Sequence, residues 1–184
     1  MKSSIRKTTF QIIYNLLDSV SPISEDCGLL CGAACCLCTD EDMGIYLLPG
    51  EEKMFTRKED WLSWDWLDTD KYEFPESWHG KVPFLICKAH GHCPRNERPI
   101  QCRTFPLAPH IDDEGTLYLI YQRGQLPYSC PLIDEKIKLN EDFIKATYKA
   151  WSMLISEPLI RDLVLMDSEY RIEDKVNIDI VYPV

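Results

Sequence analysis

The chain has 184 residues, of which 45% are hydrophobic and 27% charged, and its formal net charge is -10. This length fits one domain with a substantial core, and the composition is that of an ordinary soluble globular protein. The low sequence pI of about 4.8 and the absence of a basic patch argue against nucleic acid as a partner.

The N-terminal segment predicts an amphipathic helix within residues 1–22. Phe10, Ile13, Tyr14 and Leu17 fall on one helical face. Polar residues interrupt the apolar part, and no small-residue cleavage site follows, so the segment makes a poor signal peptide. No apolar run approaches the roughly 18 residues of a membrane helix. We therefore expect a cytoplasmic protein with no membrane partner.

Five of the nine cysteines lie in CGLLCGAACCLC, residues 27–38. The odd total, the chain length and the lack of an export signal count against a disulfide framework. Buried free cysteine is common, but it does not explain this density. Cys27, Cys31 and Cys35 recur every four residues, so in a helical or turn-rich segment they project to nearly one side. Metal ligation explains this spacing best, with thiol chemistry as an alternative.

The middle of the chain predicts short strands. GIYLLPG is typical of a strand ended by Pro49 and Gly50, and the following Glu51 and Glu52 suit the start of a helix. WLSWDWLDTD is interpreted as aromatic side chains that fold back over a loop as a small satellite core. VPFLIC predicts a buried strand that ends at Cys87, and LAPHI with TLYLIYQ predicts a hairpin.

A second group of cysteines begins in VPFLICKAHGHCPRNERPIQCRTFP, with Cys87, Cys93 and Cys102, and Cys130 follows in YSCPLI. A separation of roughly fifty residues from the first group is normal where a fold brings two loops together around one metal site. His90 and His92 precede Cys93, and each suits either a metal ligand or an exposed loop.

The last quarter of the chain, residues 140–184, predicts helices and a strand. EDFIKATYKAWSMLIS carries apolar residues at helical spacing, and Pro158 restarts a second helix that runs through Leu165. KVNIDIVYPV alternates as a strand does. We therefore expect a small single α+β domain over residues 1–184, with short strands and helices built around a cysteine-rich metal site in residues 27–131.

The order C-x3-C-x3-CC, YLLPGEE and C-x5-C-x4-RP-x2-CR-x-FP resembles the YkgJ-type cysteine-cluster proteins, a family described as a zinc- or iron-chelating domain. The resemblance covers roughly residues 27–131, and RPIQCRTFP is its most specific part. The family's usual opening is C-x2-C-x2-CC, so the first two steps are each one residue wider here. Cys38 lies outside the pattern. The resemblance implies a metal site drawn from Cys27, Cys31, Cys35, Cys36, Cys87, Cys93 and Cys102, with Cys130 next in line.

The preferred cofactor is an iron-sulfur cluster, with zinc as the alternative. A structural zinc site usually takes its four ligands from two C-x2-C knuckles, and this pair is missing. Iron-sulfur clusters accept more irregular spacing, and seven or eight thiols exceed one zinc site. Cys31, Cys35 and Cys38 also match the C-x3-C-x2-C of radical S-adenosylmethionine enzymes. Because the repeated strand-helix units of those enzymes are absent, we interpret this match as accidental.

Two arginines bracket Cys102, namely Arg98 and Arg103. A thiolate-bound cluster is negatively charged, so a guanidinium beside it stabilises it. We assign this cofactor-binding role to Arg103, with a structural salt bridge as the alternative. Glu51 or Glu52 is a further ligand candidate, since the family motif has a glutamate near this point.

Three functions remain open. The first is a metal-binding protein whose cysteines hold an iron-sulfur cluster or zinc, with a role in redox sensing or electron transfer. The second is an enzyme that uses the cluster to modify protein side chains, because the family also resembles part of the flagellin lysine methylases. The third is a structural zinc module for protein interaction. No Gly-rich cofactor loop favours the second function, and the protein partner and any catalytic residue are left open.

Overall fold

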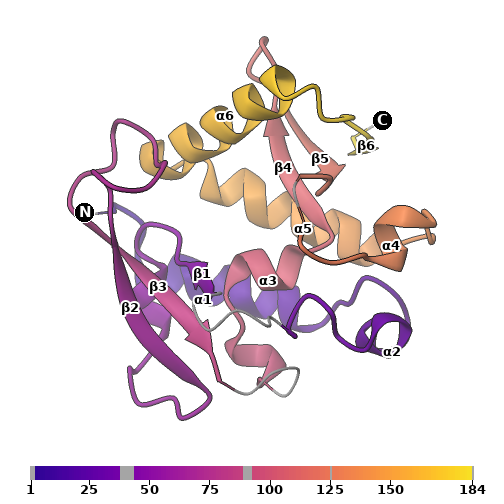
Figure 1. Ribbon diagram of the computed structural model, residues 1–184, viewed down its shortest axis with the longest axis horizontal. Helices are drawn as coiled ribbons and strands as arrows, with labels where there is room; N and C mark the ends of the chain where they lie inside the picture. Colours follow the sequence, from indigo (N-terminus) through magenta and orange to yellow (C-terminus); the bar gives the residue numbers. More distant parts are fainter. Residues whose placement is uncertain (1–2, 38–43, 89–92, 125, 184) are drawn as a thin grey trace.

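The computed structural model describes residues 3–37, 44–88, 93–124 and 126–183. It contains two small antiparallel sheets, β1-β3-β2 and β4-β5-β6, together with helices, so the predicted α+β class is confirmed (Figure 1). The elements in chain order are α1 (Lys7–Asp18), α2 (Gly28–Cys31), β1 (Gly44–Tyr46), η1 (Glu51–Met54), β2 (Leu62–Asp68), β3 (Lys81–Cys87), η2 (Arg95–Glu97), α3 (Ile100–Thr104), β4 (Leu107–Ile111), β5 (Leu117–Tyr121), α4 (Pro131–Asp134), α5 (Glu141–Leu154), α6 (Pro158–Glu173) and β6 (Ile180–Tyr182).

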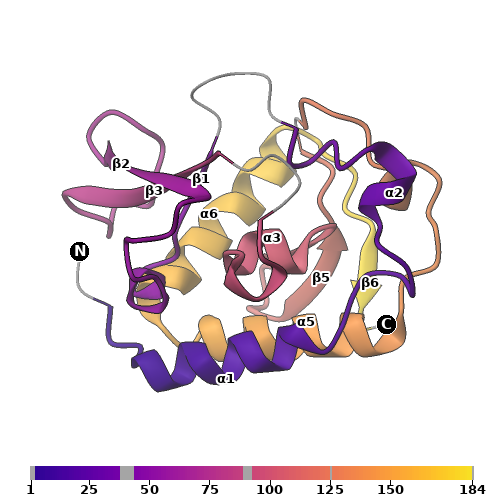
Figure 2. The same cartoon turned by 90° about the horizontal axis from the view of Figure 1, so that it is seen from below.

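Helix α1 confirms the predicted N-terminal helix. Phe10, Ile13, Tyr14 and Leu17 are all buried, as their spacing predicts. This apolar face packs mainly against α5, and Figure 2 shows the two helices side by side along one edge of the molecule.

The main core lies between these helices, α6 and the β4-β5-β6 sheet. The predicted hairpin is confirmed, with Leu107 opposite Tyr121 and Ile111 opposite Leu117. Helix α6 starts at Pro158 as predicted but runs past Leu165 to Glu173, because later positions on the same face are also buried. The C-terminal strand is shorter than the alternation predicts, since only β6 pairs with β5.

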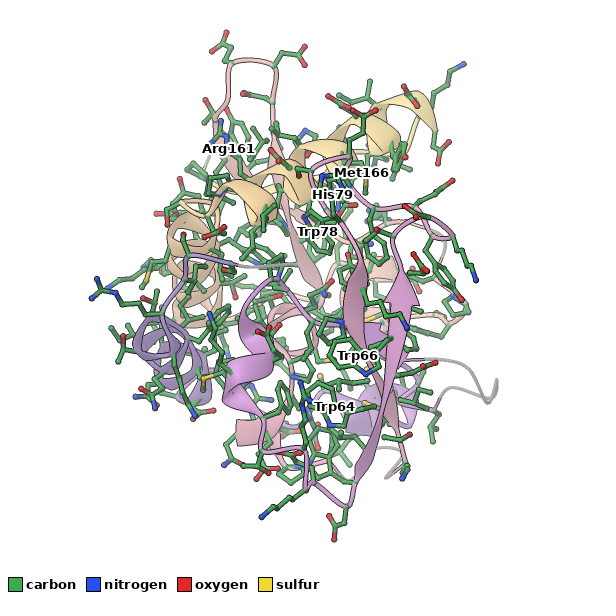
Figure 3. The ribbon with its side chains drawn as sticks, turned by 90° about the vertical axis from the view of Figure 1, so that its left-hand side faces the viewer. Trp64, Trp66, Trp78, His79, Arg161 and Met166 are labelled. Atoms are coloured by element: carbon green, nitrogen blue, oxygen red, sulfur yellow. The ribbon has the colours of Figure 1, made fainter. Side chains whose placement is uncertain are left out.

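The β1-β3-β2 sheet contains two predicted strands and one missed strand. The interpretation of residues 61–70 as a loop was wrong, because Leu62–Asp68 pairs along its whole length with β3. The predicted satellite core is present, since Trp61 and Trp64 pack against a small cluster of Leu47, Leu62 and Leu85. Figure 3 shows Trp64 and Trp66 next to each other on β2, well apart from Trp78 near α6.

Helix α3 lies at the centre of the molecule, between the two sheets (Figures 1 and 2). Among the described residues, no helix is long and apolar enough to cross a membrane.

Candidate metal centre

The first cysteine segment folds as one helical turn followed by tight turns. Helix α2 ends at Gly32, whose φ of 62° is left-handed, and Ala33 follows with a φ of 59°. The chain then turns back, because the N–H of Cys36 donates to the carbonyl of Ala33 at 2.7 Å. Left-handed backbone favours glycine because glycine has no Cβ atom, which explains Gly32, whereas Ala33 adopts this conformation with a Cβ atom present.

Helix α3 presents Cys102 and is fixed at both ends by buried charged residues. At its start, the N–H of Ile100 donates to Glu51 Oε1 at 2.7 Å. Near its end, Arg103 Nη1 donates to Asp18 Oδ1 of α1 at 2.6 Å. Glu51 is fully buried and Arg103 is only 5% exposed, so both anchors belong to the interior. The position of Cys102 is therefore set by contacts with η1 and α1.

Four cysteines from three separate segments come together beside α3. Cys36 shares a hydrogen bond with Cys93, and its sulfur lies 3.9 Å from that of Cys35. The charges of Cys36 and Cys93 also act on Cys102. We call Cys35, Cys36, Cys93 and Cys102 the Cys36 group. The fold thus brings Cys35 and Cys36 next to cysteines that lie more than fifty positions later in the sequence.

Hydrogen bonds within the Cys36 group shift the pKa values of its thiols in directions that fit one chain of donors and acceptors. The hydrogen bond to Cys36 raises the pKa of Cys93, and burial raises it further. The hydrogen bond to Cys35 raises the pKa of Cys36 to about 11, whereas the same contact lowers the pKa of Cys35. These directions fit Cys93 donating to Cys36, and Cys36 donating to Cys35.

Cys102 is accessible to solvent and yet closely surrounded by protein. Its side chain is exposed, but burial among protein atoms is the first cause that raises its pKa, followed by the charges of Cys36 and Cys93. Solvent exposure and close surrounding by protein are both satisfied when the thiol lies in a recess, which is open to solvent but in which few water molecules surround the sulfur. Such a position suits a metal ligand, because an ion can enter and bulk water is kept away.

One arginine contacts the Cys36 group directly. Arg98 Nε donates a hydrogen bond to the sulfur of Cys93 at 3.1 Å. A hydrogen bond from a guanidinium stabilises a thiolate, and contacts of this kind tune metal-bound sulfur. The sequence shows Arg98 next to Cys102, but its contact with Cys93 depends on the turn of η2 and could not be read from spacing.

Arg103, the arginine assigned to cofactor binding, has its described contacts elsewhere. Its guanidinium lies 4.2 Å from the centre of the Tyr14 ring, and Nε donates to the carbonyl of Arg98 at 2.6 Å. With the ion pair to Asp18, these contacts give Arg103 the structural role that the sequence left as the alternative. A cofactor-binding role for Arg103 stays a prediction.

A second set of cysteines belongs to α2 and to the start of α4. Burial raises the pKa of Cys27, and the charges of Cys31 and Cys130 contribute to the shift. Cys130 is buried at the start of α4, and burial likewise raises its pKa. Figure 1 shows α2 and α4 on the same side of the molecule. We call Cys27, Cys31 and Cys130 the Cys27 group.

The remaining predicted residues are placed as follows. Cys87 is half-buried at the end of β3, opposite Leu62 of β2. His90, His92 and Cys38 lie outside the residues that the structure describes. Glu51 faces the interior, where its carboxylate accepts hydrogen bonds from Tyr14, Leu48 and Ile100, and its charge contributes to the raised pKa of Cys102.

Seven of the described cysteines, namely Cys27, Cys31, Cys35, Cys36, Cys93, Cys102 and Cys130, form no disulfide bond. Within residues 3–37, 44–88, 93–124 and 126–183, however, no three His, Cys, Asp or Glu side chains are arranged so as to hold a metal ion. The donor chemistry therefore fits a thiolate-bound metal, while a ready-made coordination geometry is not present in the described part.

Comparisons with known proteins found no similarity on which to draw. No protein-family model matches the chain, no curated protein is significantly similar in sequence, and no solved structure is significantly similar in fold. The resemblance to the YkgJ-type cysteine-cluster family therefore stays a prediction that depends on the quoted motifs.

Proposed function

We propose that this protein binds a metal centre through its cysteines, and that the centre is an iron-sulfur cluster held by the Cys36 group. The observation that carries the proposal is the hydrogen bond between Cys36 and Cys93, with Cys35 and Cys102 beside them. Four thiols are the number that a [2Fe–2S] or [4Fe–4S] cluster takes from a protein.

Two further features support a thiolate-bound metal centre beside α3. Arg98 donates to the sulfur of Cys93, and hydrogen bonds to cluster sulfurs are a main means of setting cluster potential. The Cys27 group adds three more thiols nearby, linked to the first group through the charges that Cys27 and Cys31 exert on Cys35. Seven thiols exceed the four that one zinc ion or one cluster takes, so the Cys27 group supports thiolate binding of a metal without deciding which metal.

Metal binding would have to draw the side chains of the Cys36 group closer together. The backbone hydrogen bonds described for residues 27–37 are local, and α2 is a single turn. A segment held by local contacts adjusts at low cost, whereas α3 is anchored by Glu51 and Arg103. We therefore expect Cys35 and Cys36 to move toward Cys93 and Cys102 when the metal binds.

The test is to purify the protein without oxygen or chelator and to measure iron, zinc, acid-labile sulfide and the visible spectrum. We expect brown protein with iron and sulfide, and loss of both in Cys36→Ser and in Cys93→Ser. Cys38→Ser is the matched control, because the family pattern does not include Cys38, and it should keep its metal. Colourless protein with stoichiometric zinc would replace the cluster by a zinc site. Protein with no metal, before and after anaerobic reconstitution, would refute the proposal.

A further inference from the structure

A cavity of about 740 Å³ lies beside α3, on the side where α3 faces α6 and the β4-β5 hairpin. Its lining comes from β1, α3, β4, α5, α6 and the loop that follows β5, and no cysteine is among the described lining residues. The volume is within the range of small-molecule sites, which is roughly 300–1,000 Å³. This cavity is therefore separate from both cysteine groups and large enough for a ligand.

Two residues of the lining carry a buried hydrogen-bond donor that has no partner among the described residues. The first donor is Nε1 of Trp151, a residue only 3% exposed, and the second is Nε of Arg123. A buried donor that lacks an acceptor is costly, by about 1–3 kcal/mol. Both groups can only donate. A ligand that removes this free-energy cost must therefore carry hydrogen-bond acceptors.

The charges around the cavity favour a ligand with a single negative charge. Arg123 lies 3.3 Å from Asp179, and this carboxylate is also bound by the exposed Lys136 at 2.9 Å, so Asp179 neutralises Arg123 only in part. Arg171 lies 4.0 Å from Asp167, and these two charges offset each other. The other acid in the lining, Asp174, is exposed just past the end of α6, where water screens it.

The rest of the lining is largely apolar and aromatic. Phe105 and Leu126 lie on the side of α3 and the loop after β5, and Leu163 and Val164 belong to α6. Such walls favour a flat apolar body over a strongly hydrated one. A phosphate dianion would need more positive charge than this cavity offers and would leave the apolar walls without a partner.

We propose that this cavity binds a small organic carboxylate with a flat apolar body, whose carboxylate accepts hydrogen bonds from Trp151 Nε1 and Arg123 Nε. The apolar body lies against Phe105 and α6. The proposal uses none of the cysteines, so it holds or fails independently of the metal centre.

The probe is 3-phenylpropanoate, titrated into the full-length ¹⁵N-labelled protein near neutral pH. The chain has five tryptophans, and Trp151→Phe identifies the indole N–H signal of Trp151. We expect this signal to move downfield as the acid binds, because its hydrogen gains an acceptor. The neutral amide, 3-phenylpropanamide, should bind at least about fivefold more weakly, and the cation 3-phenylpropylamine should not move the signal.

Two variants and one control test the named donors. Trp151→Phe and Arg123→Lys should each weaken binding of the acid by about fivefold or more, since each removes one donor. Binding to the variants is followed by their backbone amide signals, because Trp151→Phe lacks the indole reporter. Arg123→Lys keeps the positive charge, so it still tests the donor if Trp151→Phe fails to fold. Trp61→Phe is the matched control, because Trp61 already donates to Glu97 at 2.8 Å and does not line the cavity.

Several results would overturn the proposal. They are binding of the amine as tight as that of the acid, equal binding of acid and amide, unchanged binding in both donor variants, or no change in the Trp151 signal at about 10 mM acid.

Discussion

Glu51 accepts a hydrogen bond from the backbone N–H of Ile100, with 2.7 Å between Oε1 and the nitrogen, although the two residues are 49 positions apart. The same carboxylate accepts from Tyr14 Oη at 2.8 Å and from the N–H of Leu48 at 3.1 Å. One buried side chain therefore holds α1, η1 and the start of α3 together. Because α3 carries Cys102, the candidate metal centre depends on this contact.

The first prediction concerns the replacement of that carboxylate. Glu51→Gln should lower the free energy of unfolding by about 2–3 kcal/mol, because the amide group brings two donors to a place where three donors already point. Urea denaturation monitored by circular dichroism measures the change. Glu52→Gln on the same turn is the control and should cost less than about 0.5 kcal/mol. Equal stability of the two variants would contradict the role given to Glu51.

The second prediction separates the two roles of Arg103. Arg103→Lys should lower the free energy of unfolding by about 2 kcal/mol, because lysine cannot donate from Nε to the carbonyl of Arg98 and stack on Tyr14 at the same time. The exposed Arg6 provides the control, as Arg6→Lys, with little expected effect. Metal content measured on the same samples decides the alternative. Normal stability with reduced metal would favour the cofactor-binding role instead.

The elements that the sequence predicted well are those with a strong local pattern. The spacing of Phe10, Ile13, Tyr14 and Leu17 identifies α1, because residues three and four positions apart lie on the same face of a helix and this face is buried. Strand β2 was missed although Ser63 and Asp65 alternate with larger apolar residues, which is a strand signal. Its two tryptophans, with Trp61 just before the strand, suit an aromatic cluster as well as a strand, so composition and period point to different structures here.

The candidate site was predictable in its residue types and not in its contacts. The motifs name the candidate thiols, but they do not show that these divide into two groups, and the contact of Arg98 with Cys93 depends on how η2 turns the chain after Cys93. Similarly, a glutamate at the start of a helix usually faces water, and only the tertiary position of α3 turns Glu51 inward. Contacts of this kind join segments that are far apart in the sequence and close together in space, so local sequence patterns do not predict them.

The third prediction is a loss of stability in mild acid that depends on His110. Burial lowers the pKa of His110 from its usual 6.5, and the charge of Arg171 lowers it further, although Asp112 and Asp113 oppose the shift. The unfolded chain therefore binds a proton more readily than the folded one. Stability is fully present above about pH 6.5 and falls as the pH drops through the lower pKa of the folded state.

The measurement is urea denaturation at several pH values between about 7.5 and 5.5. The slope of unfolding free energy against pH should be smaller in His110→Gln than in the natural chain. His79→Gln is the control, since His79 is exposed, and its slope should equal that of the natural chain. If His110→Gln keeps the full slope, another group causes the acid sensitivity.

The fourth prediction concerns the reactivity of the thiols in reduced, metal-free protein. Cys35 is exposed, whereas Cys130 is only 7% exposed and belongs to the main core. Iodoacetamide should therefore modify Cys35 at least about tenfold faster than Cys130, because reagent reaches a buried thiol only when the structure opens locally. Tandem mass spectrometry of the digested protein follows each site.

Two comparisons make this labelling experiment decisive. In strong denaturant Cys35 and Cys130 should react at similar rates, which shows that the difference belongs to the fold. Loading the protein with its metal should then protect Cys35, if Cys35 is a ligand as proposed, and should leave the slow rate of Cys130 nearly unchanged. If Cys35 stays fully reactive in metal-loaded protein, it is not a ligand, and the fourth thiolate must come from outside the Cys36 group.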